Sequence, residues 1–223
     1  MTDVLADEGV KVPFKGIRKF AAKHMVHAWA APVFHLTVEV DMTEAMKVKT
    51  VAAGANLTDL LIQVSAKTLA AFPDFNVHVE EDGVIQYQAA NIGLAVAAPQ
   101  GLMVPVIHDA ANLNLEQIAE RRKEIVERAR TGSLARTDIT GGTFTISNLG
   151  MMGIRRFDAI LNSPQAAIVA VGSTEQRQRL VNGEPVWLPI AEFTLTCDHR
   201  AIDGAVGAAF LNHFVKLLQS PLS

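Results

Sequence analysis

The sequence is poor in cysteine, in charge and in long apolar runs, and each shortage excludes a class of protein. Cys197 is the only cysteine among 223 residues, so the chain cannot be a disulfide scaffold. Charged residues make up 19% of the chain and hydrophobic residues 49%, whereas disordered chains combine high charge with little to bury. No apolar run reaches the ~18 residues of a membrane span. We therefore expect a globular, cytoplasmic protein with no membrane partner.

The charges that are present do not gather into a basic patch. The net charge is −3, and the densest basic stretch, residues 121–123, lies beside Glu120 and Glu124. Mixed signs at this spacing are typical of a solvated helix face and not of a nucleic-acid interface. Neither a GxGxxG nor a Walker sequence is present, so nothing indicates nucleotide-phosphate binding. The low charge also fits a surface that is partly covered in a subunit interface.

Hydrophobic periodicity predicts one α/β domain, a two-layer sandwich of a mixed sheet and helices, after a flexible tail or linker stub. The tail covers residues 1–12 and the domain residues 13–223. The helix that begins near Asn56 or Thr58 has a side chain of capping type at its start. We expect helices over residues 17–28, from 56 or 58 to 69, 115–130 and 204–218, and strands over 33–41, 76–80, 84–88, 92–98, 103–107, 143–148, 167–171 and 193–197.

The sharpest chemical signal is a polar cluster where a strand passes into the last helix. Asp198, His199, Arg200 and Asp203 lie within six positions. An imidazole titrates near pH 6.5, so His199 can take and return a proton at neutral pH. Asp203 could orient that ring or hold a cation. The alternative interpretation is a helix cap with an ordinary loop ion pair.

A second signal lies at the end of the strand 143–148. Alternation places the hydroxyls of Thr143, Thr145 and Ser147 on one face, and Ser147 is the last of them before a glycine-rich loop. Its hydroxyl can therefore face a cleft. Hydroxyls on a solvated sheet face are also common, and the glycines of a nucleophile elbow are missing on either side of this serine.

Metal binding and thiol chemistry have little support. His24 with His27, or His199 with His213, could be ligands, but no CxxC or HExxH pattern accompanies them. We expect ordinary surface or core histidines and no metal. Cys197 is expected to be a buried, inert thiol, because the neighbouring carboxylate raises a thiol pKa.

Residues 198–204 (DHRAIDG) closely resemble the signature of the dihydrolipoyl acyltransferases, the core enzymes of 2-oxo acid dehydrogenase complexes. The likeness covers residues 13–220. It continues in the family's order at residues 16–19 (GIRK), 91–96 (NIGLAV), 101–107 (GLMVPVI), 141–150 (GGTFTISNLG) and 162–168 (NSPQAAI).

This resemblance implies a chloramphenicol-acetyltransferase-like fold and a homotrimer with active sites between subunits. It implies transfer of an acyl group between coenzyme A and a dihydrolipoyl group that is carried by a separate lipoyl domain of the dehydrogenase complex. The acyl group that we expect is acetyl. By position, His199 would be the general base, and Ser147 of the adjacent subunit would donate a hydrogen bond to the tetrahedral intermediate. Asp203 would have an orienting or structural role.

Several alternatives stay open. Branched-chain acyl or succinyl transfer in a sister complex is possible, as is a stand-alone acetyltransferase of the chloramphenicol type or an inactive trimeric scaffold. The residues that contact coenzyme A are not assigned. His24 stands where many relatives have arginine. No lipoyl domain or subunit-binding domain precedes residue 13, and the chain stops at Ser223, so we expect an isolated catalytic core whose trimers assemble poorly into a cubic or icosahedral core.

Overall fold

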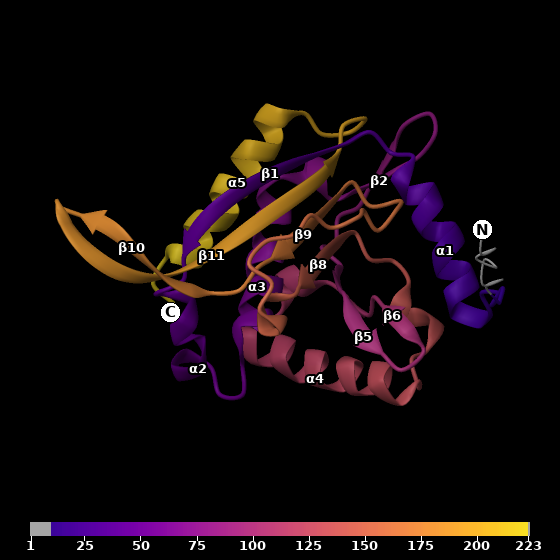
Figure 1. Cartoon of the computed structure of the whole chain (residues 1–223), viewed down its shortest axis with the longest axis horizontal. Helices are drawn as coiled ribbons and strands as arrows, with labels where there is room; N and C mark the ends of the chain where they lie inside the picture. The colour runs from indigo at the N-terminus through magenta and orange to yellow at the C-terminus, as the bar shows by residue number, and fades with distance from the viewer. Residues whose placement is uncertain (1–9, 223) are drawn as a thin grey trace, which may run out of the picture.

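A seven-stranded mixed sheet forms the centre of the molecule, which is known from a computed structural model that describes residues 10–222. The strand order is β1-β11-β9-β8-β4-β7, and β10 pairs with β11 as a projecting hairpin (Figure 1). Strand β8 runs parallel to β4 and β9, and the other neighbours are antiparallel. The strands are β1 (Val33–Asp41), β4 (Ile92–Leu94), β7 (Val106–Ile107), β8 (Phe144–Asn148), β9 (Ala167–Val171), β10 (Glu175–Val181) and β11 (Glu184–Asp198).

Helices pack against the sheet and form the second layer, so the predicted α/β sandwich is confirmed. Helix α5 contacts β1, β11 and α3, and α3 contacts α4 and β4. Two small hairpins lie outside the seven-stranded sheet, β2 with β3 and β5 with β6. Their bounds are Val77–Val79, Val84–Gln86, Val96–Ala98 and Gly101–Met103, and the helices are α1 (Gly16–Trp29), α2 (Val48–Val51), α3 (Leu57–Ala71), α4 (Leu115–Thr131) and α5 (Gly204–Gln219).

The core lies between the sheet and helices α3 and α5, where aromatic rings meet. Phe210 of α5 stacks on Phe75, with ring centroids 4.0 Å apart, and contacts Phe144 of β8. All three side chains are fully buried. Burying a side chain of this kind contributes roughly 1.5–3 kcal/mol. These contacts hold β8, the strand that carries Ser147, against the helix that follows His199.

The helix starts follow the capping signals in the sequence. Asn56, one of the two expected caps of α3, accepts hydrogen bonds from the first turn and forms a capping box with Asp59. The buried Asp59 also pairs with Arg122 of α4 at 2.6 Å, which ties the two helices together. Helix α4 begins with the predicted cap Asn114 and ends at Gly132, whose φ of 72° favours glycine.

The predicted strands 92–98 and 103–107 are each broken. The amide of Ala95 donates to Ile146 of β8, after which residues 96–98 leave the main sheet to pair with β6. Residues 101–103 therefore belong to the small hairpin, and only residues 106–107 pair with β4. A continuous apolar run in the sequence does not reveal where a strand changes its pairing partner, because the residues before and after the change are both in the β conformation.

The hairpin of β10 and β11 is absent from the sequence prediction. The segment 193–197 predicts only the last part of β11. Asn182 and Gly183 form the turn with φ of 52° and 87°, which is the two-residue turn that an Asn-Gly pair favours. That signal is present in the sequence. The polar residues of β10 concealed it, since three of them are arginine or glutamate (Glu175, Arg177, Arg179).

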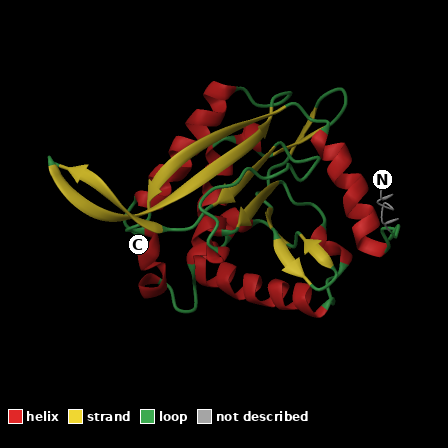
Figure 2. Ribbon diagram, in the orientation of Figure 1, coloured by secondary structure: helices red, strands yellow, loops and turns green. Residues whose placement is uncertain are grey.

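Helix α1 is formed where predicted, but its apolar stripe is not buried within the chain. Ala28 is 2% exposed, whereas Phe20 is 73% exposed and Trp29 72%. The helix lies at the edge of the molecule opposite the β10–β11 hairpin (Figure 2). Most of the predicted tail, residues 1–9, lies outside the described residues. In the part of the chain that the structure describes, no helix is long and apolar enough to cross a membrane.

Candidate active site

His199 lies just beyond the end of β11 and is exposed. Its amide donates to the carbonyl of Pro32 at 2.8 Å, which continues the pairing of β11 with β1 by one residue. The imidazole packs against Phe34, with ring centroids 4.9 Å apart and the planes tilted by 55°. The ring is therefore supported on one side and accessible on another, as a proton carrier requires.

Asp198 holds the turn that contains His199. Its carboxylate is buried and accepts hydrogen bonds from the backbone amide and the Nε of Arg200, each at 3.0 Å. The bond to Asp198 raises the pKa of the Arg200 guanidinium. The backbone amide of Asp198 donates to Ala166 at 2.9 Å. This ion pair is thus the ordinary loop ion pair that the sequence left open, and it fixes the backbone on which His199 sits.

Asp203 is the N-cap of α5. Its Oδ1 accepts a hydrogen bond from the amide of Val206 at 3.0 Å, and its backbone has the extended conformation of a cap. No hydrogen bond joins Asp203 to His199 among residues 10–222. The resemblance implies an orienting or a structural role for Asp203, and the geometry directly shows the structural role, as the cap of α5.

Ser147 is the half-buried, second-last residue of β8. The two earlier hydroxyls on the same strand face are tied down: Thr143 Oγ1 accepts from the amide of Asn91, and Thr145 Oγ1 donates to Gln165 Oε1 at 2.6 Å. The hydroxyl of Ser147 has no hydrogen-bond partner within the described residues. It is the one hydroxyl of this face that is left free to meet a ligand.

The sheet keeps His199 and Ser147 of one chain apart. Ser147 is level with Ala170 of β9, and Ala170 is level with Thr194 of β11. His199 follows Thr194 by five positions and lies two strands away, so about 3.3 Å per residue and about 4.8 Å per strand separate the two backbones by roughly 20 Å. Within one chain the two predicted site residues do not come together. Each could meet its counterpart only on another copy.

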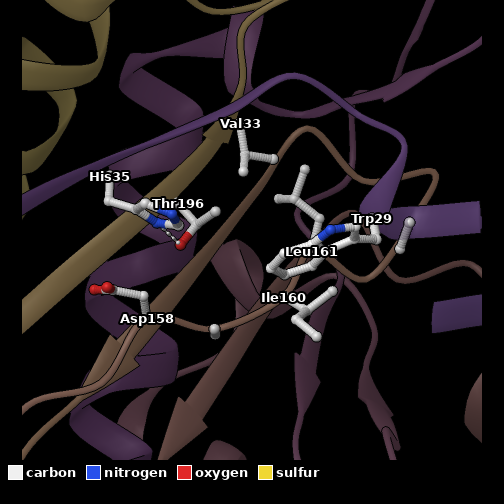
Figure 3. Close-up of a pocket in the computed structure, with 9 residues that line it drawn as sticks. Trp29, Val33, His35, Asp158, Ile160, Leu161 and Thr196 are labelled. Carbon is white, nitrogen blue, oxygen red and sulfur yellow. Dashed lines mark hydrogen bonds between the residues drawn. The ribbon is translucent and has the colours of Figure 1, made fainter. Parts of the chain in front are cut away.

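A surface cavity of about 210 Å³ lies on the sheet face opposite Phe34, and the sequence did not predict it. His35 Nδ1 and Thr196 Oγ1 are 2.9 Å apart in it, and Figure 3 shows this pair beside Asp158. The cavity contains neither His199 nor Ser147. Strand alternation alone could have predicted that His35 lies on this face of the sheet. It could not have predicted the cavity, because the other wall is formed by residues 158–161, which are far from His35 in the sequence. The lining residues are Ala28, Trp29, Val33, His35, Asp158, Ala159, Ile160, Leu161 and Thr196.

Glu192, a buried carboxylate of β11, anchors the loop that follows Ser147. It accepts hydrogen bonds from Arg155 of that loop at 2.9 Å and from Arg177 of β10 at 3.0 Å. Burial alone would raise the pKa of Glu192, but the two hydrogen bonds and the guanidinium charges outweigh it, so the pKa lies below its usual value. The loop and the hairpin are both fixed to the sheet through this group.

The remaining histidines and the cysteine have other surroundings. His24 lies 3.3 Å from the side-chain oxygen of Asn162, and His213 packs on Phe72. In residues 10–222 no three His, Cys, Asp or Glu side chains gather as metal ligands would. Burial, together with the charge of Asp198, raises the pKa of Cys197 to about 12, and the predicted burial of this thiol is confirmed.

The fold and sequence place the chain among known proteins. The fold is that of chloramphenicol acetyltransferase, with a TM-score of 0.57 at 13% identity over 88% of this chain and 94% of the other. The family model of the 2-oxoacid dehydrogenases acyltransferase catalytic domain matches residues 6–223. The chain therefore belongs to the family of 2-oxoacid dehydrogenase acyltransferase catalytic domains.

Curated relatives in this family are longer than the chain. The dihydrolipoyllysine-residue acetyltransferase component of the pyruvate dehydrogenase complex from Rickettsia felis is 34% identical over 94% of this chain and 53% of its own length. The component of the same name from Zymomonas mobilis is 37% identical over 86% of this chain and 45% of its own length. The chain thus spans about half the length of the curated relatives that it matches.

Solved structures agree over nearly the whole chain. A probable dihydrolipoamide acetyltransferase from Listeria monocytogenes has a TM-score of 0.89 at 31% identity and covers 96% of both chains. The dihydrolipoamide acetyltransferase of Azotobacter vinelandii has a TM-score of 0.88 at 30% identity, covering 95% of this chain and 91% of its own. That structure belongs to an investigation of a serine, a histidine and an asparagine in the catalytic mechanism. The serine and histidine are 52 positions apart, and the asparagine follows the histidine by four.

Proposed function

We propose that this chain transfers an acetyl group between coenzyme A and the dihydrolipoyl group of a lipoyl domain, as the core subunit of a cytoplasmic pyruvate dehydrogenase complex. The observation that supports this most directly is a pair of groups, the exposed imidazole of His199 and the half-buried hydroxyl of Ser147, which has no hydrogen-bond partner within the described residues. They stand 52 positions apart in the sequence, and Asp203 follows His199 by four. This is the spacing of the serine, histidine and asparagine studied in the Azotobacter vinelandii enzyme.

The residue types suit thioester exchange. A thiol with a pKa near 8.5 is mostly protonated at neutral pH, so His199 removes the thiol proton as the sulfur attacks the thioester carbonyl. The carbonyl oxygen becomes an oxyanion, and a hydrogen bond from Ser147 stabilises it by about 2–4 kcal/mol. The intermediate collapses with cleavage of the original carbon–sulfur bond, and the imidazolium returns its proton to the departing thiolate. The exchange balances without a metal or a covalent enzyme intermediate.

The active unit in this proposal is a homotrimer in which Ser147 of one subunit meets His199 of the next. The roughly 20 Å separation within a chain favours this arrangement. The exposed apolar side chains of α1, among them Phe20 and Trp29, are the kind of surface that a subunit interface covers. The cubic core of a pyruvate dehydrogenase complex has a TM-score of 0.87 with this chain at 30% identity, which supports assembly of this type.

The experiment measures acyl transfer from acetyl-CoA to free dihydrolipoamide by the purified protein, with chloramphenicol as the rival acceptor. We expect transfer to dihydrolipoamide and none to chloramphenicol. Isobutyryl-CoA and succinyl-CoA are then compared as donors, and acetyl-CoA should give the highest kcat/KM. Transfer to chloramphenicol alone, or no transfer at all, would contradict the proposed activity, and a preference for either of the other donors would contradict the assignment of the acetyl group.

A further inference from the structure

A chain of side-chain hydrogen bonds connects α1 to the strand that carries Ser147. His24 Nε2 lies 3.3 Å from Asn162 Oδ1, and Asn162 Nδ2 lies 3.2 Å from Thr145 Oγ1. Thr145 in turn donates to Gln165 Oε1 at 2.6 Å. Thr145 and Gln165 are buried, and His24 and Asn162 are half-buried. The four residues come from α1, from β8 and from the loop before β9, so they join segments that the backbone alone does not connect.

The direction of every bond in this chain is determined. Thr145 gives its only proton to Gln165, so it must accept from the amide nitrogen of Asn162. The oxygen of Asn162 then faces His24, and only a proton on Nε2 of His24 can complete the contact. His24 is therefore the first donor in this series of hydrogen bonds. A side chain without a donor at this position would leave the Asn162 oxygen without its partner and release the loop.

The loop fixed in this way touches the Ser147 strand directly. Thr145 precedes Ser147 by two residues and projects from the same strand face. The space around the Thr145 hydroxyl is tight, since a Cβ on Gly93 would lie 3.0 Å from it. If Asn162 shifts, β8 or the side chains on it must therefore move as well.

We infer that His24 is a positioning residue that acts through Asn162 and Thr145 to hold the hydroxyl of Ser147 where the oxyanion forms. The inference rests on the proposed acyl transfer. The ring of His24 stacks on Phe20 one turn earlier, with centroids 6.3 Å apart, and this contact orients its Nε2 toward Asn162.

The test is a double-mutant cycle between His24 and Ser147, with His24→Leu as the variant without a donor and His24→Gln as the matched control that keeps one. In the wild-type background we expect His24→Leu to lower kcat about tenfold with little change in KM, because the variant misplaces the oxyanion contact without removing it. His24→Gln should stay within about twofold. In the Ser147→Ala background, His24→Leu should cause no further loss, because the group that it positions is gone.

A second readout does not depend on activity. Amide hydrogen exchange over residues 160–166 should be faster in His24→Leu than in wild type and unchanged in His24→Gln. An equal loss of kcat in both backgrounds, wild-type kcat in His24→Leu, or unchanged exchange would each overturn the inference. If the wild-type protein transfers no acyl group, the proposed function fails, and the exchange experiment still decides whether His24 holds the loop.

Discussion

The ends of β11 and β8 present the two candidate catalytic groups, and the chain organises them by different means. Beyond β11, His199 sits on a turn held by charge, through the pair of Asp198 with Arg200 and the cap Asp203. At β8, the strand before Ser147 is held by neutral hydrogen bonds of Thr145. Each group is exposed or half-buried while its support is fixed. Each half of the site is thus pre-organised within a chain, and in the proposed trimer a second copy completes the site.

The largest expected effect is at the β11 end. His199→Ala removes the group proposed to take and return the thiol proton, so we expect acyl transfer to fall below detection. The thermal midpoint should stay within a few degrees of wild type, since an exposed ring contributes little to stability. Steady-state kinetics and a melting curve on the same preparation check both points. Substantial turnover in this variant would remove His199 from the mechanism.

The next effect is at the β8 end. Ser147→Ala removes the proposed hydrogen bond to the oxyanion and leaves the imidazole of His199 intact, so we expect kcat to fall about a hundredfold. KM for acetyl-CoA should change little, because the bond forms in the transition state. A normal kcat would show that another donor occupies this position.

A smaller effect separates support from chemistry in the β11 half. Asp203→Ala deletes the cap of α5 and should lower the free energy of unfolding by about 1 kcal/mol. Asp203→Asn keeps a capping oxygen and should match wild type in both stability and kcat. Urea unfolding of the two variants measures the difference. If Asp203→Asn lost activity while keeping stability, a charge-dependent orienting role would replace the structural one.

The smallest effect concerns the loop after Ser147 and depends on pH. The pKa of Glu192 is lower in the folded chain than its ordinary value, which in an unfolded chain is about 4.3. The stabilisation is therefore complete above that value and is lost as the pH falls through the folded pKa. Between neutral pH and pH 3, the free energy of unfolding should fall more steeply in wild type than in Glu192→Gln. Parallel curves would mean that the ion pairs with Arg155 and Arg177 contribute nothing.

Local signals in the sequence predicted much of the fold and both catalytic candidates. Asn56 and Asn114 cap the helices that they were expected to cap, because a cap depends only on the adjacent turn. The alternation of apolar and polar residues over 33–41 predicted strand β1 with the bounds that the structure shows. His199 and Ser147 became candidates because each stands where a strand ends in polar or glycine-rich sequence, and their catalytic roles stay a prediction.

Long-range relations were beyond the sequence. The contact of His24 with Asn162 spans 138 positions, and no local pattern encodes it. The same holds for the strand order that keeps Ser147 and His199 apart, in which β9 lies between β8 and β11. Periodicity predicted the apolar stripe of α1 but not its exposure, because the spacing of apolar residues does not show what their side chains pack against.

The claim that one site is shared by two subunits is tested most directly by mixing defective chains. Ser147→Ala and His199→Ala subunits are co-expressed with different affinity tags, and trimers that contain both are isolated by tandem purification. Because a cyclic trimer pairs each serine with the histidine of its neighbour, every trimer that contains both chains has one intact site, so about a third of the wild-type sites should be restored. We predict acyl transfer well above that of either parent trimer. Mixed trimers no more active than the Ser147→Ala parent would contradict the shared site.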